Sequence, residues 1–178
     1  MENTQRIIAV SRKLRITCKG LIICLPVIYG IFWTFFNQFY NMGPLVPLPV
    51  RVDHDLPRLT RSLAFLVDMI PMMAIIYGLR KLEDLFRLYE KGLIFTEQHV
   101  RCFRSLGRTL IVWVGCDVLR NSLLSMVLTL DKTPGTRVIT VGLGSADFAA
   151  VFVGIVVVIL SWVMDEGRKI QEDQALIV

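Results

Sequence analysis

The sequence predicts an all-α integral membrane protein: a four-helix bundle with both termini in the cytoplasm and a cytoplasmic helical hairpin between the second and third spans. Three observations predict this fold. The chain contains four long apolar stretches, its apolar share is 54% with a mean hydropathy of +0.57, and its basic residues are unevenly distributed. Soluble domains contain about 45–50% apolar residues. Because the connections are short, we interpret residues 1–178 as one membrane domain.

Each apolar stretch is long enough to cross a bilayer, which takes about 20 helical residues. The stretches cover residues 20–40, 59–79, 109–130 and 145–164. The first run is longer than the roughly 7–15 residues of a signal-peptide core, and no small-residue cleavage pattern follows, so we expect a retained helix. The basic arm before it is either a surface-bound amphipathic segment or an early start of the same helix.

The basic residues predict the orientation. Fourteen of the 20 lysines and arginines lie before the first span, between the second and third, or after the fourth. Five lie toward the opposite side: four in the other two connections, and Arg61 at the start of the second span. Cytoplasmic loops carry the excess of basic residues, so these first segments are expected inside the cell. Acidic residues interrupt the basic middle loop, so we expect no direct contact with nucleic acid.

The middle loop predicts an ordered hairpin over residues 80–108. Leucines and aromatics at helical spacing extend the second helix to about Glu90, and a glycine follows that suits a left-handed helix end. Thr96 is positioned to cap a new helix, with Phe95 and Val100 as a hydrophobic staple. We expect this hairpin to bind a partner through Gly92, Ile94, Phe95, Thr96, Glu97 and Arg104.

The run LYEKGLIFTE at residues 88–97, followed by Val100 and by RSLG at residues 104–107, resembles the hallmark of a bacterial membrane family of unknown function, DUF2975. The resemblance implies four spans, a G-x-I-F-T turn, an inner-membrane location and an acidic C-terminal tail. The tail here is QEDQALIV, with Ala175 where a smaller polar residue is expected. Some members look to be encoded beside small helix-turn-helix regulators, which implies a possible cytoplasmic partner. The resemblance implies no activity.

Three charged residues fall near the middle of the predicted spans. Asp68 lies in the second span, and Asp117 and Arg120 lie in the third, all roughly 12–16 Å deep. Asn121 shares the helix face of Asp117 and Arg120. Antiparallel neighbouring spans would bring Asp68 to Arg120 in an ion pair that fixes helix register. Two carboxylates share one guanidinium, so this cluster has two alternative interpretations. It could relay protons or cations, or it could contact a ligand or a partner.

The fourth span carries a row of small residues, Ala146, Ala150 and Gly154, which suits close packing within the chain or between two copies. Asp147 beside this row is expected to be solvated. The sequence lacks the phosphate-loop, nucleophile-elbow and paired-cysteine patterns, and His54 stands alone in a loop. We therefore expect no enzymatic activity, no cofactor and no metal.

These patterns favour a non-enzymatic protein of the bacterial inner membrane that interacts with, or regulates, a cytoplasmic partner through its hairpin and C-terminal tail. The alternative is a small transporter or channel subunit that uses Asp68, Asp117 and Arg120. Because four spans rarely enclose a pathway alone, that alternative requires a homo-oligomer.

Overall fold

A computed structural model describes residues 2–40, 48–50, 52, 55–92, 96–130 and 140–175. Within these residues the chain is all-α and forms no strand. Each of the four long helices contains a segment apolar and long enough to cross a membrane, as the sequence predicts. The helices are α1 (Glu2–Thr34), the short α2 (Phe36–Tyr40), α3 (Arg58–Glu90), α4 (Glu97–Leu128) and α5 (Ser145–Ala175).

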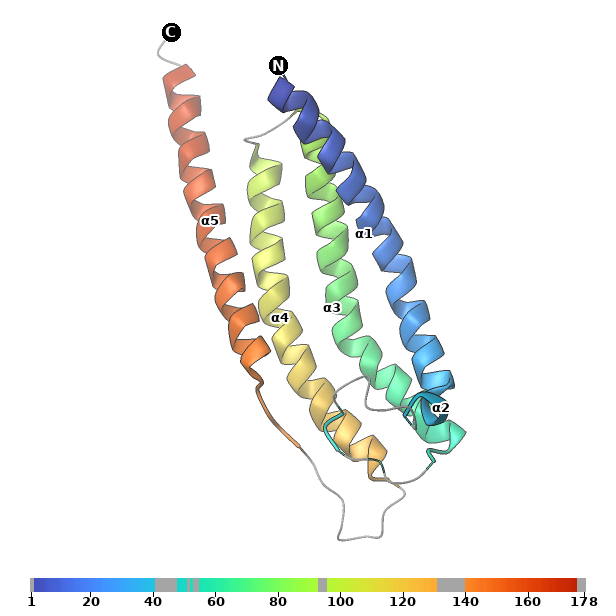
Figure 1. The fold of residues 1–178 in the computed structure, drawn as a ribbon. Coiled ribbons are helices and arrows are strands. Elements are labelled where there is room, and N and C mark those ends of the chain that lie inside the picture. The colour runs from blue at the N-terminus through green and yellow to red at the C-terminus, as the bar shows by residue number, and fades with distance from the viewer. Residues whose placement is uncertain are drawn as a thin grey trace.

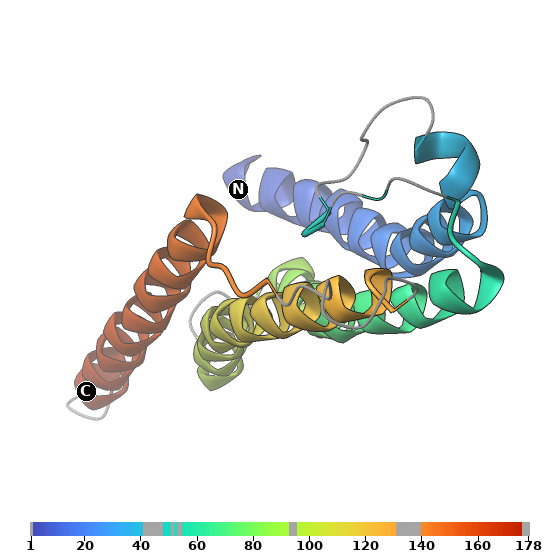
Figure 2. The same cartoon turned by 90° about the horizontal axis from the view of Figure 1, so that it is seen from below.

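The four long helices form an open row, which differs from the bundle that the sequence predicts. Helix α1 packs on α3, α3 on α4, and α4 on α5; within the described residues no other pair of long helices packs extensively. Figure 1 shows this order, and Figure 2 shows α5 at the edge of the row, next to α4 and away from α1. In a bilayer an apolar helix flank can face lipid as favourably as protein, so hydropathy alone does not require the row to close.

The two ends of the row differ in character. At one end, α1 begins, α3 is followed by α4, and α5 finishes (Figure 1). We call this the turn end. At the opposite end lie α2 and the start of α3, and we call this the loop end.

The predicted helix limits at the turn end are confirmed. Helix α3 ends at Glu90 and α4 begins at Glu97. Gly92 has a φ of 72°, the left-handed conformation that only glycine adopts freely, and its N–H donates to the carbonyl of Tyr89. Of the predicted tip residues, Ile94 and Phe95 lie outside the described residues.

The first span ends earlier than predicted. Helix α1 stops at Thr34, and after a turn at Phe35 the chain forms α2 instead of continuing one helix to Tyr40. The carbonyl of Thr34 accepts a hydrogen bond of 2.7 Å from Arg61, and the N–H of Gln38 bonds to Phe35 instead. A side chain from α3 thus takes the carbonyl that would have extended the ladder of α1.

An apolar core fills the loop end. It contains residues from α1, α2, α3 and α4, together with Val52 and Leu56 from the connection before α3. The side-chain amide of Asn37 in α2 bonds both backbone groups of Leu56, which holds this connection against the helices. Loop residues therefore insert between the helices and contribute to the core.

Ion pairs between helices brace the turn end. Arg15 of α1 pairs with Glu90 of α3 at 3.2 Å, and Lys19 pairs with Glu83 at 3.4 Å. The basic N-terminal arm is an early start of α1, since helix is continuous from Glu2. Because α1 lies alongside α3 here, the predicted hairpin is buttressed by a third helix.

Candidate functional site

The intramembrane site is built around Asp68 on α3. Its side chain is 2% exposed, and its Oδ1 accepts a hydrogen bond of 2.6 Å from Nε of Arg120 on α4. The structure therefore contains the contact predicted between the second and third spans. A carboxylate and a guanidinium so placed lower each other's cost of insertion into hydrocarbon.

A third helix contributes to the same site through Trp33, which sequence reasoning missed. Nε1 of Trp33 on α1 donates to Oδ2 of Asp68 at 2.6 Å, and the indole is 2% exposed. The Trp33 ring also stacks on Phe36, with 5.1 Å between centroids. One signal was present in the sequence, because a tryptophan N–H in an apolar span needs an acceptor. Each oxygen of Asp68 thus accepts a hydrogen bond from a different neighbouring helix.

Asp117 is connected to the site by a hydrogen bond from the side-chain amide of Asn121, and not by an ion pair with Arg120. Nδ2 of Asn121 donates to Asp117 at 2.9 Å, and Oδ1 of Asn121 accepts from Arg120 at 3.1 Å. Among the described residues, no basic side chain forms an ion pair with Asp117. The side-chain hydrogen bonds thus form a continuous chain that begins at Trp33 and ends at Asp117. The ion pair within it joins Asp68 to Arg120.

Polar side chains continue along α4 toward the loop end at intervals of four residues. Ser125 and Thr129 follow Asp117 and Asn121 on this face, and both are fully buried. The Thr129 hydroxyl donates to the carbonyl of Ser125 at 2.8 Å, and the Ser125 hydroxyl accepts from the N–H of Thr140 at 3.0 Å. A stripe of polar groups therefore connects the middle of the membrane with the loop end.

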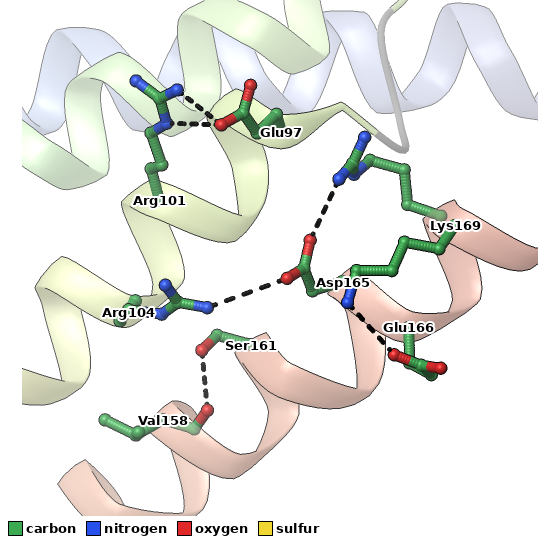
Figure 3. A network of polar contacts seen from close by, with 9 residues as sticks. Glu97, Arg101, Arg104, Val158, Ser161, Asp165, Glu166 and Lys169 are labelled. Atoms are coloured by element: carbon green, nitrogen blue, oxygen red, sulfur yellow. Dashed lines mark hydrogen bonds and ion pairs between the residues drawn. The ribbon is translucent and has the colours of Figure 1, made fainter. Parts of the chain in front are cut away.

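The tip at the turn end is organised by His99. Thr96 occupies the cap position of α4, as predicted, but its hydroxyl makes no capping bond to the backbone. It lies 2.9 Å from Nδ1 of His99, which is fully buried and packs on the ring of Tyr89 from α3. Glu97 bonds Arg101 one turn along α4 (Figure 3). The contacts of His99 tie the first turn of α4 to the last turn of α3.

The small-residue row on α5 makes an internal contact at one position. Gly154 meets Gly107 of α4 so closely that a Cβ on Gly107 would lie 2.6 Å from the Gly154 carbonyl oxygen. Ala146 is exposed and Ala150 is half-buried. Asp147 is buried, and the expectation that it is solvated was wrong: its carboxylate accepts from the N–H of Gly144 at 2.7 Å and caps α5.

Comparison with protein families identifies the group to which this chain belongs. The family model DUF2975, described as "Protein of unknown function", matches residues 20–178, which include three of the four apolar segments whole and the second half of the first. The chain is a member of the DUF2975 family. Searches of curated proteins and of solved structures found no match to it.

Membership of DUF2975 defines the chain as part of a four-span family and assigns no activity. The sites described above must therefore be interpreted from their own chemistry. Among the described residues of this DUF2975 chain, no group of three or more His, Cys, Asp or Glu side chains is placed to hold a metal ion. Its candidate sites are the charged line at Asp68 and the braced tip at the turn end.

Proposed function

We propose that this protein is a non-enzymatic component of the bacterial inner membrane that binds a cytoplasmic protein through its turn end. The observation that carries the proposal is the set of ion pairs that tie neighbouring helices together there. Arg15–Glu90 and Lys19–Glu83 join α1 to α3, and Arg104 on α4 reaches Asp165 on α5 at 3.9 Å (Figure 3). Four long helices are thereby held at the end that presents the hairpin.

A rigid surface favours binding because less conformational freedom is lost when the partner docks. Lys91, Glu97, Gln98 and Arg101 are exposed around the tip, so the partner would meet a polar surface of mixed charge. Helix α5, whose last turns form the first part of the C-terminal tail, finishes at the same end (Figure 1). A small helix-turn-helix regulator is the partner class that we favour, with the hairpin and tail as its docking site.

The test is site-specific photo-crosslinking in living cells. A photoreactive amino acid replaces exposed Gln98 at the turn end or, as the matched control, exposed Leu143 at the loop end. We expect a discrete protein adduct from position 98 and none of that mass from position 143. The same adducts from both positions, or lipid adducts alone, would contradict a partner at the turn end.

A second candidate function, an oligomeric transporter or channel subunit, is favoured by the polar stripe on α4. Asp117 is outside the ion pair, and Asn121, Ser125 and Thr129 extend from it toward the loop end. Such a line of groups suits proton or cation movement. Proteoliposome flux should then fall on Asp117→Asn, while no flux, or flux unaltered by this change, would remove the candidate.

A further inference from the structure

A groove between α3 and α4 near the turn end combines arginines with an apolar floor. It has a volume of about 560 Å³. Its lining is Ala74, Tyr77, Arg101, Arg104, Ser105, Arg108, Thr109 and Val112. Ligand sites commonly measure about 300–1,000 Å³, so the groove has room for a small polar headgroup.

The positive charge of the groove is only partly neutralised. Arg108 is exposed and makes no ion pair or hydrogen bond with any described residue. Nε of Arg104 is buried without a hydrogen-bond partner in the described part of the chain, and the Arg104–Asp165 pair is long at 3.9 Å. The Arg101–Glu97 pair is exposed on both sides and therefore contributes little to stability. Nζ of Lys81 lies 5.6 Å from the centre of the Tyr77 ring, but it is paired with Asp84 at 3.6 Å and so adds little free charge at the rim.

The groove lies at the boundary between the predicted hydrocarbon and headgroup regions. Arg108 directly precedes the third predicted span, and Tyr77 lies close to the end of the second. The Tyr77 hydroxyl is 3.1 Å from the hydroxyl of Ser105, so aromatic and polar groups meet at this level. Ala74 and Val112 line the groove on the membrane side, where an acyl chain would run.

We propose that this groove binds the phosphate headgroup of an anionic phospholipid from the leaflet at the turn end. Arginine recognises phosphate oxygens in a paired geometry that suits this ligand. Basic pockets between transmembrane helices on the cytoplasmic side are typical sites for anionic headgroups. Arg108 supplies the unpaired charge, Arg101 turns from Glu97 toward the phosphate, and Tyr77 and Ser105 supply hydroxyls. Lipid binding requires no protein partner, although Arg101 belongs both to the groove and to the exposed surface at the tip.

The experiment uses native mass spectrometry of the full chain after removal of bound lipid. Phosphatidylglycerol and phosphatidylcholine with the same acyl chains are added in separate titrations. The wild type should retain phosphatidylglycerol in preference to phosphatidylcholine. One arginine near a membrane surface is worth about fivefold in binding, so Arg108→Gln should weaken the phosphatidylglycerol adduct about fivefold, and Arg101→Gln with Arg108→Gln about thirtyfold.

Two further variants separate the groove from general surface charge. Arg80→Gln removes the same charge from an exposed position on α3 that does not line the groove, and it should leave the adduct unchanged. Ala74→Phe fills the groove without changing charge and should weaken the adduct. An equal loss from Arg80→Gln and Arg108→Gln, or equal retention of both lipids, would overturn the proposal.

A soluble-anion arm distinguishes a lipid from a free phosphate. Inorganic phosphate at millimolar concentration should leave the phosphatidylglycerol adduct in place, because it lacks the acyl chain that Ala74 and Val112 would contact. Displacement of the lipid by phosphate at matched concentration would show a soluble-anion site and overturn the lipid assignment.

Discussion

At the scale of single residues, Asp68 joins three helices through one carboxylate. Oδ1 accepts from Arg120 on α4 and Oδ2 accepts from Trp33 on α1, both at 2.6 Å. A buried ion pair gains little over apolar packing as a whole, but removal of one partner leaves the other charge uncompensated. The two acids of the site are therefore unequal, since Asp117 receives an amide N–H instead of a guanidinium.

Replacement of Asp68 by asparagine should destabilise the protein by about 3–5 kcal/mol, because Arg120 would remain in the membrane interior without its counter-charge. Asp117→Asn is the matched control. It should lower the free energy of unfolding by less than about 1.5 kcal/mol, because it changes only the hydrogen bond that Asp117 accepts from the neutral amide of Asn121. The free energy of unfolding in mixed detergent micelles measures both. Equal losses would mean that Arg120 does not depend on Asp68.

The sequence predicted the Asp68–Arg120 pair because depth and antiparallel order suffice to place two charges together. It did not predict the Trp33 contact, since α1 could have packed on either flank of α3. Burial of Asp147 was missed for a related reason: a carboxylate at a helix start is equally suited to water and to the N–H of Gly144. Side-chain partners depend on helix rotation, which hydropathy does not determine.

At the scale of elements, the α4–α5 contact depends on two glycines. A Cβ on Gly107 would meet the Gly154 carbonyl oxygen at 2.6 Å and Cγ2 of Val158 at 2.7 Å. The Gly154 carbonyl oxygen belongs to the backbone and cannot rotate away, so the helices would have to separate.

Gly107→Ala should therefore reduce the free energy of unfolding by about 1–3 kcal/mol, the usual cost of overpacking. Gly115→Ala on the same helix is the control, because no described atom beyond its own helix lies within 4 Å of the added Cβ. That change should be neutral or stabilising by up to about 1 kcal/mol. A loss from Gly115→Ala as large as from Gly107→Ala would show that the close approach does not matter.

Helix limits were predictable where the chain itself provides the signal. The end of α3 at Glu90 and the start of α4 at Glu97 follow from periodicity, the left-handed Gly92 and the cap at Thr96. The break at Phe35 was missed because residues 20–40 are mostly apolar and contain no charged residue. It depends on Arg61, which takes the Thr34 carbonyl from another helix.

At the scale of the whole molecule, the number of spans was predictable and their arrangement was not. Apolar length determines how many helices cross the membrane. A lipid-facing flank and a protein-facing flank can be equally apolar, so hydropathy does not distinguish an open row from a closed bundle. Exposed apolar residues on α5, among them Phe148 and Phe152, follow from the open arrangement.

The orientation across the membrane is predicted from the distribution of basic residues and can be tested directly. In a cysteine-free background, Gln98→Cys at the turn end should react with a membrane-impermeant maleimide only after spheroplasts are lysed. Leu143→Cys at the loop end should react in intact spheroplasts. Labelling of Gln98→Cys before lysis would reverse the orientation.

The open row has a consequence for how the chain assembles. Every extensive contact joins two long helices that follow one another along the chain. Each pair of neighbouring helices can therefore pack without waiting for a later one. Local contacts form with little loop-closure cost, and synthesis delivers the N-terminal elements first. The Trp33–Asp68–Arg120 line can then lock as soon as α4 has been inserted, while α5 is still being made. The last helix then docks onto α4, where the Gly107–Gly154 approach leaves no room for an added Cβ.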